Sequence, residues 1–290
     1  MQLAINIILS TSIYLLLSLS FSIIYCSSKS LYLSHAIYVT CGAYFCYYFL
    51  VTLSLSLVVA VPASIFFVVL LGLFIESNIY KRFRKNLVSS LLQMIASLGI
   101  YICLQNFISI LWGDNMRSIQ LGSIKVGIEV LRGYITQPQI AIIIVCITLF
   151  VVVALFKKYN RIGRNINAIS SNPVLAEIFG INIDKSILWA TGIGSGLAAI
   201  SGILVAFDTG LTPTMGFNLL LYGMVTMILG GIRSTWGLIC GAVLLATLQH
   251  LTAYYIDSKW MDAITYFTLI IFLLWKPLGF SGKRLKKVEI

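Results

Sequence analysis

Lys157 to Ser186 reads KKYNRIGRNINAISSNPVLAEIFGINIDKS, a polar and cationic stretch of about thirty residues between two long apolar runs. So many charged and polar groups do not fit inside hydrocarbon, so the chain must leave a membrane here. Asn172 can cap a helix, Pro173 suits its first position, and Gly180 can take the left-handed conformation after its end. The stretch therefore predicts a helix of about two turns outside the membrane.

This short helix carries several apolar side chains, and a helix of two turns is not stable alone in water. The segment before it also has apolar residues at helical spacing, with basic and amide side chains pointing elsewhere. Two arrangements follow: both segments pack under the transmembrane bundle of the same chain, or they dock onto another protein. The apolar residues concerned are Ile162, Ile166 and Ile169 in the first segment and Val174, Leu175, Ile178, Phe179 and Ile181 in the second.

The composition is that of a polytopic membrane protein. Hydrophobic residues make up 59% of the chain and charged residues 10%, and the mean hydropathy is +0.98. The net charge of +11 does not indicate nucleic acid, because the cations lie in short segments between apolar runs, where the positive-inside rule explains them. The six cysteines are single and lack metal-ligand or paired spacing, so we expect neither a metal site nor a cofactor.

Apolar runs of spanning length predict an all-α transmembrane bundle that occupies residues 1–290 as one domain, with the loop 157–186 outside the membrane. Nine spans are expected, but 217–232 and 261–275 are short enough to be re-entrant or broken helices, so eight spans is the alternative. The nine predicted segments are 3–26, 36–55, 57–75, 88–112, 139–156, 187–207, 217–232, 237–256 and 261–275.

With nine spans, sixteen Lys and Arg residues fall on one side of the membrane and four on the other. The basic side contains the loop 157–186 and the C-terminal tail, so the positive-inside rule places both in the cytoplasm and the N-terminus outside. Gly113 to Pro138 is the main external segment, and its mixed charge predicts a small extracellular cap.

Small residues recur at spacings of four in two of the predicted spans. Gly194, Ala198 and Gly202 lie on one stripe of the first, and Gly237 and Gly241 repeat the pattern in a later one. Small side chains let helix backbones approach closely where lipid supplies no hydrophobic drive. We therefore expect these five residues at tight helix contacts.

No catalytic motif is present, because the sequence lacks a Walker A loop, a nucleophile elbow, an HExxH pair and a carboxylate pair. The chain is therefore not expected to be an enzyme or to hydrolyse ATP itself. Its acidic residues near apolar runs, Glu76, Asp208, Asp257 and Asp262, fall at the ends of spans, which argues against proton coupling.

Polar residues within or beside the spans have a structural and a functional interpretation. His35 and His250 are single, and a hydrogen bond at a helix interface is the simpler role for each. Uncharged polar residues could line a path for a polar solute, or they could hydrogen-bond helix to helix, which we favour for most of them. These residues include Ser97, Gln105, Asn106, Thr226, Thr247 and Gln249.

The order of several segments resembles the permease subunits of high-affinity branched-chain amino acid ABC importers, a family that includes relatives for urea and short amides. The resemblance runs through nearly the whole chain and is specific as an ordered set. It begins at Ser18 to Tyr44, where His35 and Gly42, Ala43 and Tyr44 match, and continues through Ile75 to Lys85 and Ser97 to Gly113. Its strongest parts are NPVLAEIFGINIDKS at Asn172 to Ser186, AAISGIL at Ala198 to Leu204, MGF at Met215 to Phe217, LGGIRSTWGLICGA at Leu229 to Ala242 and KPLGFSG at Lys276 to Gly282.

The resemblance implies that the short cytoplasmic helix is a coupling helix, which docks in a groove of an ATPase subunit. Ala176, Gly180 and Ile181 stand at the positions of its motif, and Asn172 and Glu177 belong to the same helix. Of the two arrangements above, this favours docking.

The implied partners are separate ATP-hydrolysing subunits, a second permease subunit that is either identical or different, and a periplasmic or lipid-anchored binding protein. The implied location is the bacterial inner membrane, and the implied solute is a branched-chain amino acid, with urea or a short amide as an alternative. The family's glycine and acidic residue after the histidine are Ala36 and Ile37 here, so residues that contact the solute are not assigned. The alternative of another class is a stand-alone secondary transporter or channel, which would need no docking helix.

Overall fold

The computed structural model describes residues 1–119, 127–130, 133–276 and 279–280, and these form an all-α polytopic bundle. Helices dominate because lipid offers no partner for backbone N–H and C=O groups, which must bond within each segment. The elements in chain order are α1 (Gln2–Ser28), α2 (His35–Tyr47), η1 (Tyr48–Thr52), α3 (Leu57–Ile75), η2 (Glu76–Tyr80), α4 (Lys81–Lys85), α5 (Ser90–Trp112), β1 (Ile128–Val130), β2 (Gly133–Ile135), α6 (Gln137–Tyr159), α7 (Arg161–Ser171), α8 (Pro173–Ile178), α9 (Ile183–Asp208), α10 (Met215–Gly230), α11 (Thr235–Tyr255), η3 (Ser258–Trp260) and α12 (Met261–Trp275).

Each of the nine apolar runs identified in the sequence lies on a helix. In the described part of the chain, six helical segments are long and apolar enough to cross a membrane: Gln2–Ser28, Leu57–Lys85, Ser90–Trp112, Gln137–Tyr159, Ile183–Asp208 and Thr235–Tyr255. The apolar helix α10 is shorter, and α12 has only 15 residues. The second apolar run forms two consecutive elements, since the α-helix α2 ends at Tyr47 and the π-helix η1 follows it at once.

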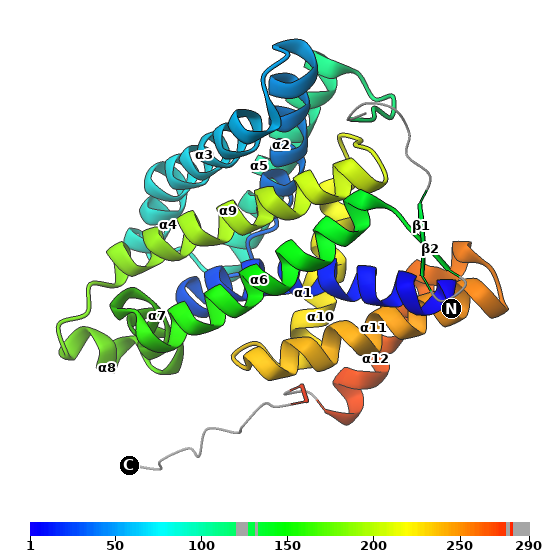
Figure 1. The fold of residues 1–290 in the computed structure, drawn as a ribbon. Helices are drawn as coiled ribbons and strands as arrows, with labels where there is room; N and C mark the ends of the chain where they lie inside the picture. The colour runs from blue at the N-terminus through cyan, green and yellow to red at the C-terminus, as the bar shows by residue number, and fades with distance from the viewer. Residues whose placement is uncertain (120–126, 131–132, 277–278, 281–290) are drawn as a thin grey trace.

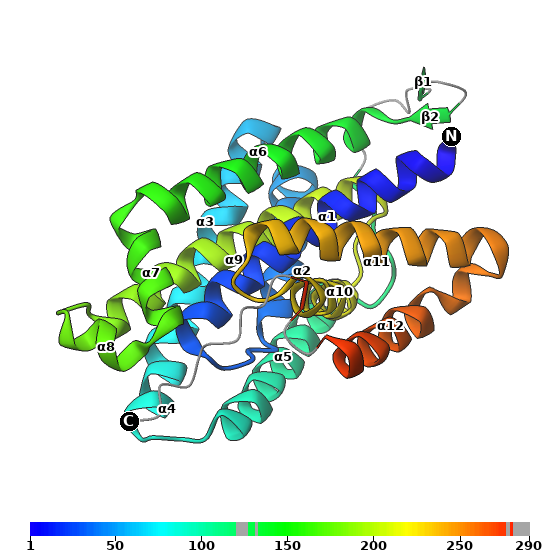
Figure 2. The ribbon, with the colours of Figure 1, turned by 90° about the horizontal axis from the view of Figure 1, so that it is seen from below.

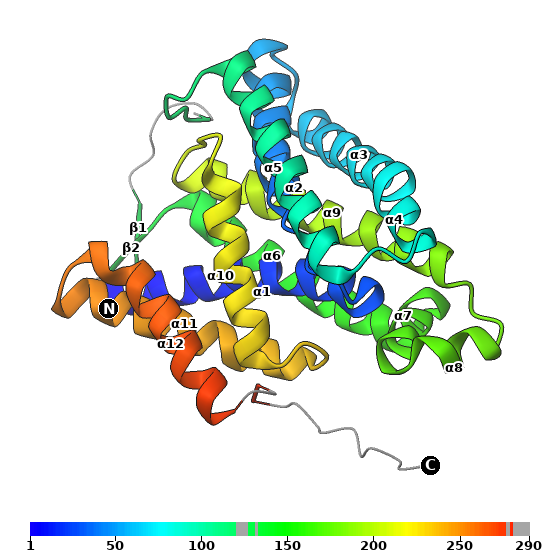
Figure 3. The same cartoon turned by 180° about the vertical axis from the view of Figure 1, so that it is seen from behind.

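The centre of the bundle is formed by α1 and α9. Within their apolar windows 78% of the residues are buried, against 17% for α5 and α6, which lie on the outside. Figure 1 shows α6 and α9 on one face of the molecule, and Figure 3 shows α5, α10 and α12 on the opposite face. The N-terminus and the strands lie at one end, and α7 and α8 lie at the other, which we call the α8 end (Figures 1 and 2).

Glycine allows α9 to touch its neighbours backbone to backbone. A Cβ atom on Gly202 would lie 2.8 Å from the carbonyl carbon of Val39 in α2, and one on Gly194 would lie 2.7 Å from Ile24 Cδ1 in α1. Ala198, between the two glycines, is fully buried. A Cβ atom closer than about 3 Å to a backbone cannot be accommodated without a shift, so the helix spacing requires these small residues.

A second close crossing joins α10 to α11. A Cβ atom on Gly241 would lie 2.5 Å from the carbonyl oxygen of Thr226, and one on Gly230 would lie 2.6 Å from the carbonyl carbon of Gly237. Gly237 and Gly241 are both buried in the interface. The two helices therefore meet through their backbones at the position of the second small-residue pattern.

The segment expected to form an external cap contains a short antiparallel hairpin, which the sequence did not indicate. β1 and β2 pair with Ile128 opposite Ile135. The backbone N–H of Tyr134 donates to Gln2 Oε1 at 2.9 Å, which attaches the hairpin to the start of α1. Two of the four cations assigned to this side, Lys125 and Arg132, lie outside the described residues.

The Gly202 contact gives a stability prediction. We expect Gly202→Ala to lower the free energy of unfolding by about 1 to 3 kcal/mol, because the added methyl group meets the backbone of Val39. Gly99→Ala in α5 is the matched control, since a Cβ atom there meets nothing within 4 Å. That control should leave stability unchanged or raise it slightly, because alanine is the better residue in a helix. Thermal unfolding of the purified protein in detergent measures both, and equal effects would show that the α2–α9 contact is not tight.

Candidate functional site

At the α8 end, α7 is the first amphipathic segment and packs against α6, α1 and α9. The side chain of Asn160 accepts from the N–H of Ile162 at 2.9 Å and so caps the helix. Ile166 and Ile169 are 1% and 0% exposed, while Arg164 on the other face is exposed. The apolar side of α7 is therefore covered by other parts of the same chain.

α8 follows as the short helix expected from the sequence, and both its ends have the expected caps. The side-chain Oδ1 of Asn172 accepts from the N–H of Leu175 at 3.2 Å. At the other end the N–H of Gly180 donates to the carbonyl of Glu177 at 2.8 Å, and the N–H of Ile181 donates to the carbonyl of Ala176 at 3.0 Å. These two bonds form a Schellman motif, which requires the left-handed φ of 78° that Gly180 adopts.

The apolar side chains of α8 are exposed, unlike those of α7. Ala176 is buried at 3% exposure and holds the helix to the protein. Glu177 points to solvent. The remaining apolar side chains, which we call the α8 patch, are Val174, Leu175, Ile178 and Phe179, with exposed fractions of 65%, 51%, 73% and 81%. Of the two arrangements left open by the sequence, packing under the bundle is found for α7, whereas docking of the uncovered α8 on another protein stays a prediction.

α9 begins at Ile183, so the four residues 179–182 connect it to α8. Asn182 caps α9 by accepting from the N–H of Lys185 at 2.9 Å. Asp184 lies in the first turn of α9, where a negative charge also stabilises the helix N-terminus.

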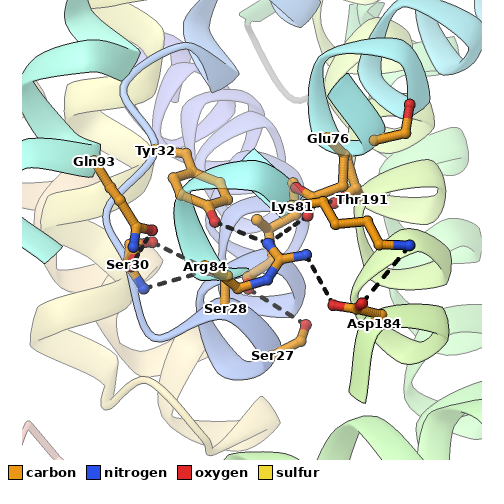
Figure 4. A network of polar contacts seen from close by, with 12 residues as sticks. Ser27, Ser28, Ser30, Tyr32, Glu76, Lys81, Arg84, Gln93, Asp184 and Thr191 are labelled. Atoms are coloured by element: carbon orange, nitrogen blue, oxygen red, sulfur yellow. Dashed lines mark hydrogen bonds and ion pairs between the residues drawn. The ribbon is translucent and has the colours of Figure 1, made fainter. Parts of the chain in front are cut away.

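An ionic network, which we call the Glu76 network, fixes the start of α9 to the end of α3 (Figure 4). Glu76 is fully buried, and its Oε1 lies 2.5 Å from Arg84 Nη1. Its other oxygen accepts from Thr191 Oγ1 in α9 at 3.3 Å. Asp184 accepts a second contact from Arg84 at 3.5 Å and lies 3.7 Å from Lys81 Nζ. Residues of η2, α4 and α9 thus share one set of charges.

The network reaches the loop between α1 and α2. Arg84 Nη1 donates to the hydroxyl of Tyr32 at 3.4 Å, and the ring of Tyr32 stacks on Tyr80 with centroids 3.8 Å apart. Burial raises the pKa of Tyr32 to about 12, so its hydroxyl stays neutral and can accept this bond. The hydroxyls of Tyr80 and Ser34 are 2.6 Å apart.

Side chains of α5 accept hydrogen bonds from the same loop, which is not helical and is partly buried. The N–H of Leu33 donates to Ser97 Oγ at 2.9 Å, and Ser30 Oγ donates to Gln93 Oε1 at 3.0 Å. Irregular backbone in a membrane protein requires such partners. The loop comes directly before His35, in the segment where this sequence departs from the pattern of the family it resembles.

The Glu76 network was missed from the sequence. Glu76 does lie at the end of an apolar run, as expected, but it is buried and paired instead of solvated. The available signal was that the helix continues past Glu76 through η2 and α4, which brings Arg84 two turns further along the same helical rod. The contact with Thr191 had no local signal, because that residue is 115 positions away.

The other polar candidates have varied roles: some join helices, but Gln105 bonds within α5, to Ser109 Oγ at 3.3 Å, and Thr226 Oγ1 has no partner in the described part of the structure. His35 Nε2 lies 3.0 Å from Ser20 Oγ, and His250 Nε2 lies 2.7 Å from Ser10 Oγ. Gln249 is fully buried, accepts from Tyr14 and donates to Thr265. Asn106 instead bonds within α5, to the carbonyl of Ile102. The described residues contain no group of three or more His, Cys, Asp or Glu that could hold a metal ion.

Comparison with known proteins identifies what the chain is similar to. Residues 3–274 match the family profile described as "Branched-chain amino acid transport system / permease component". The chain is 30% identical over 219 residues to the high-affinity branched-chain amino acid transport system permease protein LivH of Salmonella typhimurium, covering 73% of this chain and 70% of that protein. It is 25% identical over 285 residues to BraD of Pseudomonas aeruginosa, covering 94% and 92%. No solved structure matches.

The buried pair of the Glu76 network gives a second prediction. Arg84→Met leaves the Glu76 carboxylate buried without its counter-charge, so we expect the free energy of unfolding to fall by about 3 to 5 kcal/mol. The double variant Glu76→Gln with Arg84→Met removes both charges and should recover most of that loss. Lys81→Met is the control: its pair with Asp184 is more than a third exposed on the carboxylate side and should change stability by less than about 1 kcal/mol. Additive losses in the double variant would show that the two charges do not depend on each other.

Proposed function

Since the chain belongs to the permease family of branched-chain amino acid transport systems, we propose that it forms, with a second permease subunit, the translocation path of an ATP-binding cassette importer for a branched-chain amino acid. It is a multi-pass protein of the inner membrane and a transport component, not an enzyme. ATP hydrolysis belongs to separate subunits in this family.

The observation that carries the proposal is the α8 patch. Three large apolar side chains lie open on a helix of six residues that has its own caps at both ends, and Phe179 at the C-cap adds a fourth. A contiguous exposed apolar patch on an ordered element is typical of a protein interface. We propose that the patch inserts into a groove of an ATPase subunit, with Asn172 and Gly180 fixing the ends of the helix and Ala176 its buried side. Glu177 and Ile181 lie at the rim.

The connections of α8 support a coupling role. α8 leads into α9 through four residues, 179–182, and Asp184 ties the first turn of α9 to Arg84. α9 in turn touches α2 through Gly202 and α1 through Gly194. A push on α8 would therefore be passed to α9 and, through the Glu76 network, to α4 and the loop at Tyr32.

The solute and the partners follow from the relatives and not from a site in this chain. The named relatives are components of high-affinity branched-chain amino acid systems, which favours such an amino acid over urea or a short amide. Ala36 and Ile37 are fully buried, and Ala36 packs against Gly216 of α10, so neither is proposed to contact solute. A periplasmic or lipid-anchored binding protein and an identical or different second permease complete the proposed assembly.

The first functional prediction concerns the cap of α8. Gly180→Val should strain the left-handed backbone by about 1 to 2 kcal/mol and redirect Ile181. Because a Cβ atom on Gly180 meets nothing within 4 Å, the bundle and its abundance in the membrane should be unaffected. In vesicles that contain all subunits, uptake and stimulation of ATP hydrolysis by loaded binding protein should fall together.

Gly180→Asn is the matched variant, because asparagine enters the left-handed region more readily, and it should keep most of the uptake. Normal uptake by Gly180→Val would refute the coupling role of α8. Loss of uptake with the permease missing from the membrane would assign the loop to folding instead.

The second functional prediction concerns the α8 patch itself. Phe179→Ser should weaken binding of the ATPase subunit by about tenfold or more, because buried aromatic anchors carry much of the energy of an interface. Leu87→Ser is the control, since Leu87 is 92% exposed in the connection from α4 to α5, on the same end of the bundle. Co-purification with titrated ATPase measures both variants. Equal losses for the two would remove the α8 patch as the specific docking surface.

A further inference from the structure

A cleft of about 510 Å³ opens at the α8 end, beside α7. The last turns of α6, the end of α7, the end of α1 and the first turn of α11 enclose it. Figure 2 shows α6 and α11 on either side of α1, so the cleft lies between two helices that α1 separates. None of its lining residues belongs to the α8 patch or the Glu76 network.

The cleft is cationic and has no acidic wall. Lys157, Lys158 and Arg233 line it. Lys29 lies close by, because its Nζ donates to the backbone carbonyl oxygen of Ser170 at 2.5 Å. The ion pairs of the described residues all involve Lys81 or Arg84, so no carboxylate there neutralises the cations of the cleft. Cations gathered without a carboxylate partner create a positive potential, which favours binding of an anion.

Hydrogen-bonding groups accompany the charges. Ser170 lines the cleft and is only 4% exposed, yet its Oγ has no partner in the described part of the structure. Ser171 Oγ lies 2.5 Å from Arg233 Nη2, which holds the guanidinium at the rim. The first turn of α11 adds Thr235 and the positive end of a 21-residue helix. A buried hydroxyl without a partner, beside three cations, indicates a polar ligand with acceptor oxygens.

The remaining wall is apolar and leads into the membrane. Phe150, Ala154 and Leu155 of α6 and Trp236 of α11 line it, and Leu155 and Trp236 are 50% and 80% exposed. Tryptophan is enriched at the level of lipid headgroups. The ligand that matches a cationic pocket with an apolar wall directed along a transmembrane helix has an anionic head and hydrocarbon chains.

We propose that this cleft binds the phosphate headgroup of an anionic phospholipid of the cytoplasmic leaflet. Lys158 and Arg233 contact the phosphate oxygens, Ser170 supplies a hydroxyl, and the acyl chains run along Phe150 and Leu155 of α6. Basic pockets between transmembrane helices on the cytoplasmic side suit such headgroups. The lipid would join α6, α7 and α11, and so stabilise the platform from which α8 projects.

Quenching of Trp236 by brominated lipids tests the proposal on the full-length permease. The protein is reconstituted in phosphatidylcholine vesicles with either brominated phosphatidylglycerol or brominated phosphatidylcholine, and the Trp236 signal is the difference from Trp236→Phe. We expect phosphatidylglycerol to occupy the site on the order of tenfold more strongly at equal mole fraction. Equal quenching by the two lipids in the unaltered protein would overturn the proposal without any variant.

Two double variants locate the effect. Lys158→Gln with Arg233→Gln should abolish the preference for phosphatidylglycerol, while Arg82→Gln with Lys85→Gln, exposed cations at the same end of the bundle, should keep it. Loss of the preference in both would mean a general attraction to the anionic surface and would contradict a specific site.

Two further arms separate other sources of the anion. Inorganic phosphate should not remove the preference for phosphatidylglycerol, and if it does, the site takes a free anion and not a lipid. The Trp236 signal should persist in the assembly of both permeases. Loss of the Trp236 signal there would mean that an acidic surface of the second subunit fills the cleft, and it would also overturn the proposal.

Discussion

Contact between helix backbones is the constraint on which the rest of this bundle depends. Lipid is as apolar as the side chains that it meets, so no hydrophobic force drives helices together, and close packing must replace it. Gly202 against Val39 and Gly42 against Ala199 bring α9 and α2 within a distance that no side chain permits. Because α9 also touches α1 at Gly194, the central helix has fixed neighbours on two sides. These backbone contacts therefore fix the orientation of α9 without any polar contact.

The polar contacts build on that orientation at the α8 end. With α9 fixed, Thr191 and Asp184 face the end of α3, and Glu76 can be buried only because Arg84 and Thr191 satisfy its two oxygens. A buried pair of this kind adds little stability in total but strongly disfavours arrangements that separate its partners. α8 then projects from a firmly held base, with its apolar side chains uncovered.

Much of this was predictable from the sequence, and the failures have a common cause. Hydropathy located the helices, and Asn172 with Gly180 located α8, because spans and caps are local signals. Periodicity could not decide that α7 would be covered and α8 left open, since both carry apolar residues and only the surrounding helices differ. The burial of Glu76 depends on α9, and the hairpin of β1 and β2 depends on the start of α1. Each failure is a contact between segments distant in sequence.

The account requires α8 to face the compartment where ATP is hydrolysed, and side-specific cysteine labelling measures this directly. In a background with Cys103 and Cys240 replaced by serine, Glu177→Cys and Met116→Cys both place a thiol at an exposed position, at opposite ends of the bundle. An impermeant reagent added to intact cells should label Met116→Cys and reach Glu177→Cys only after the membrane is opened. Labelling of Glu177→Cys in intact cells would contradict the orientation and, with it, the docking of α8 on an ATPase.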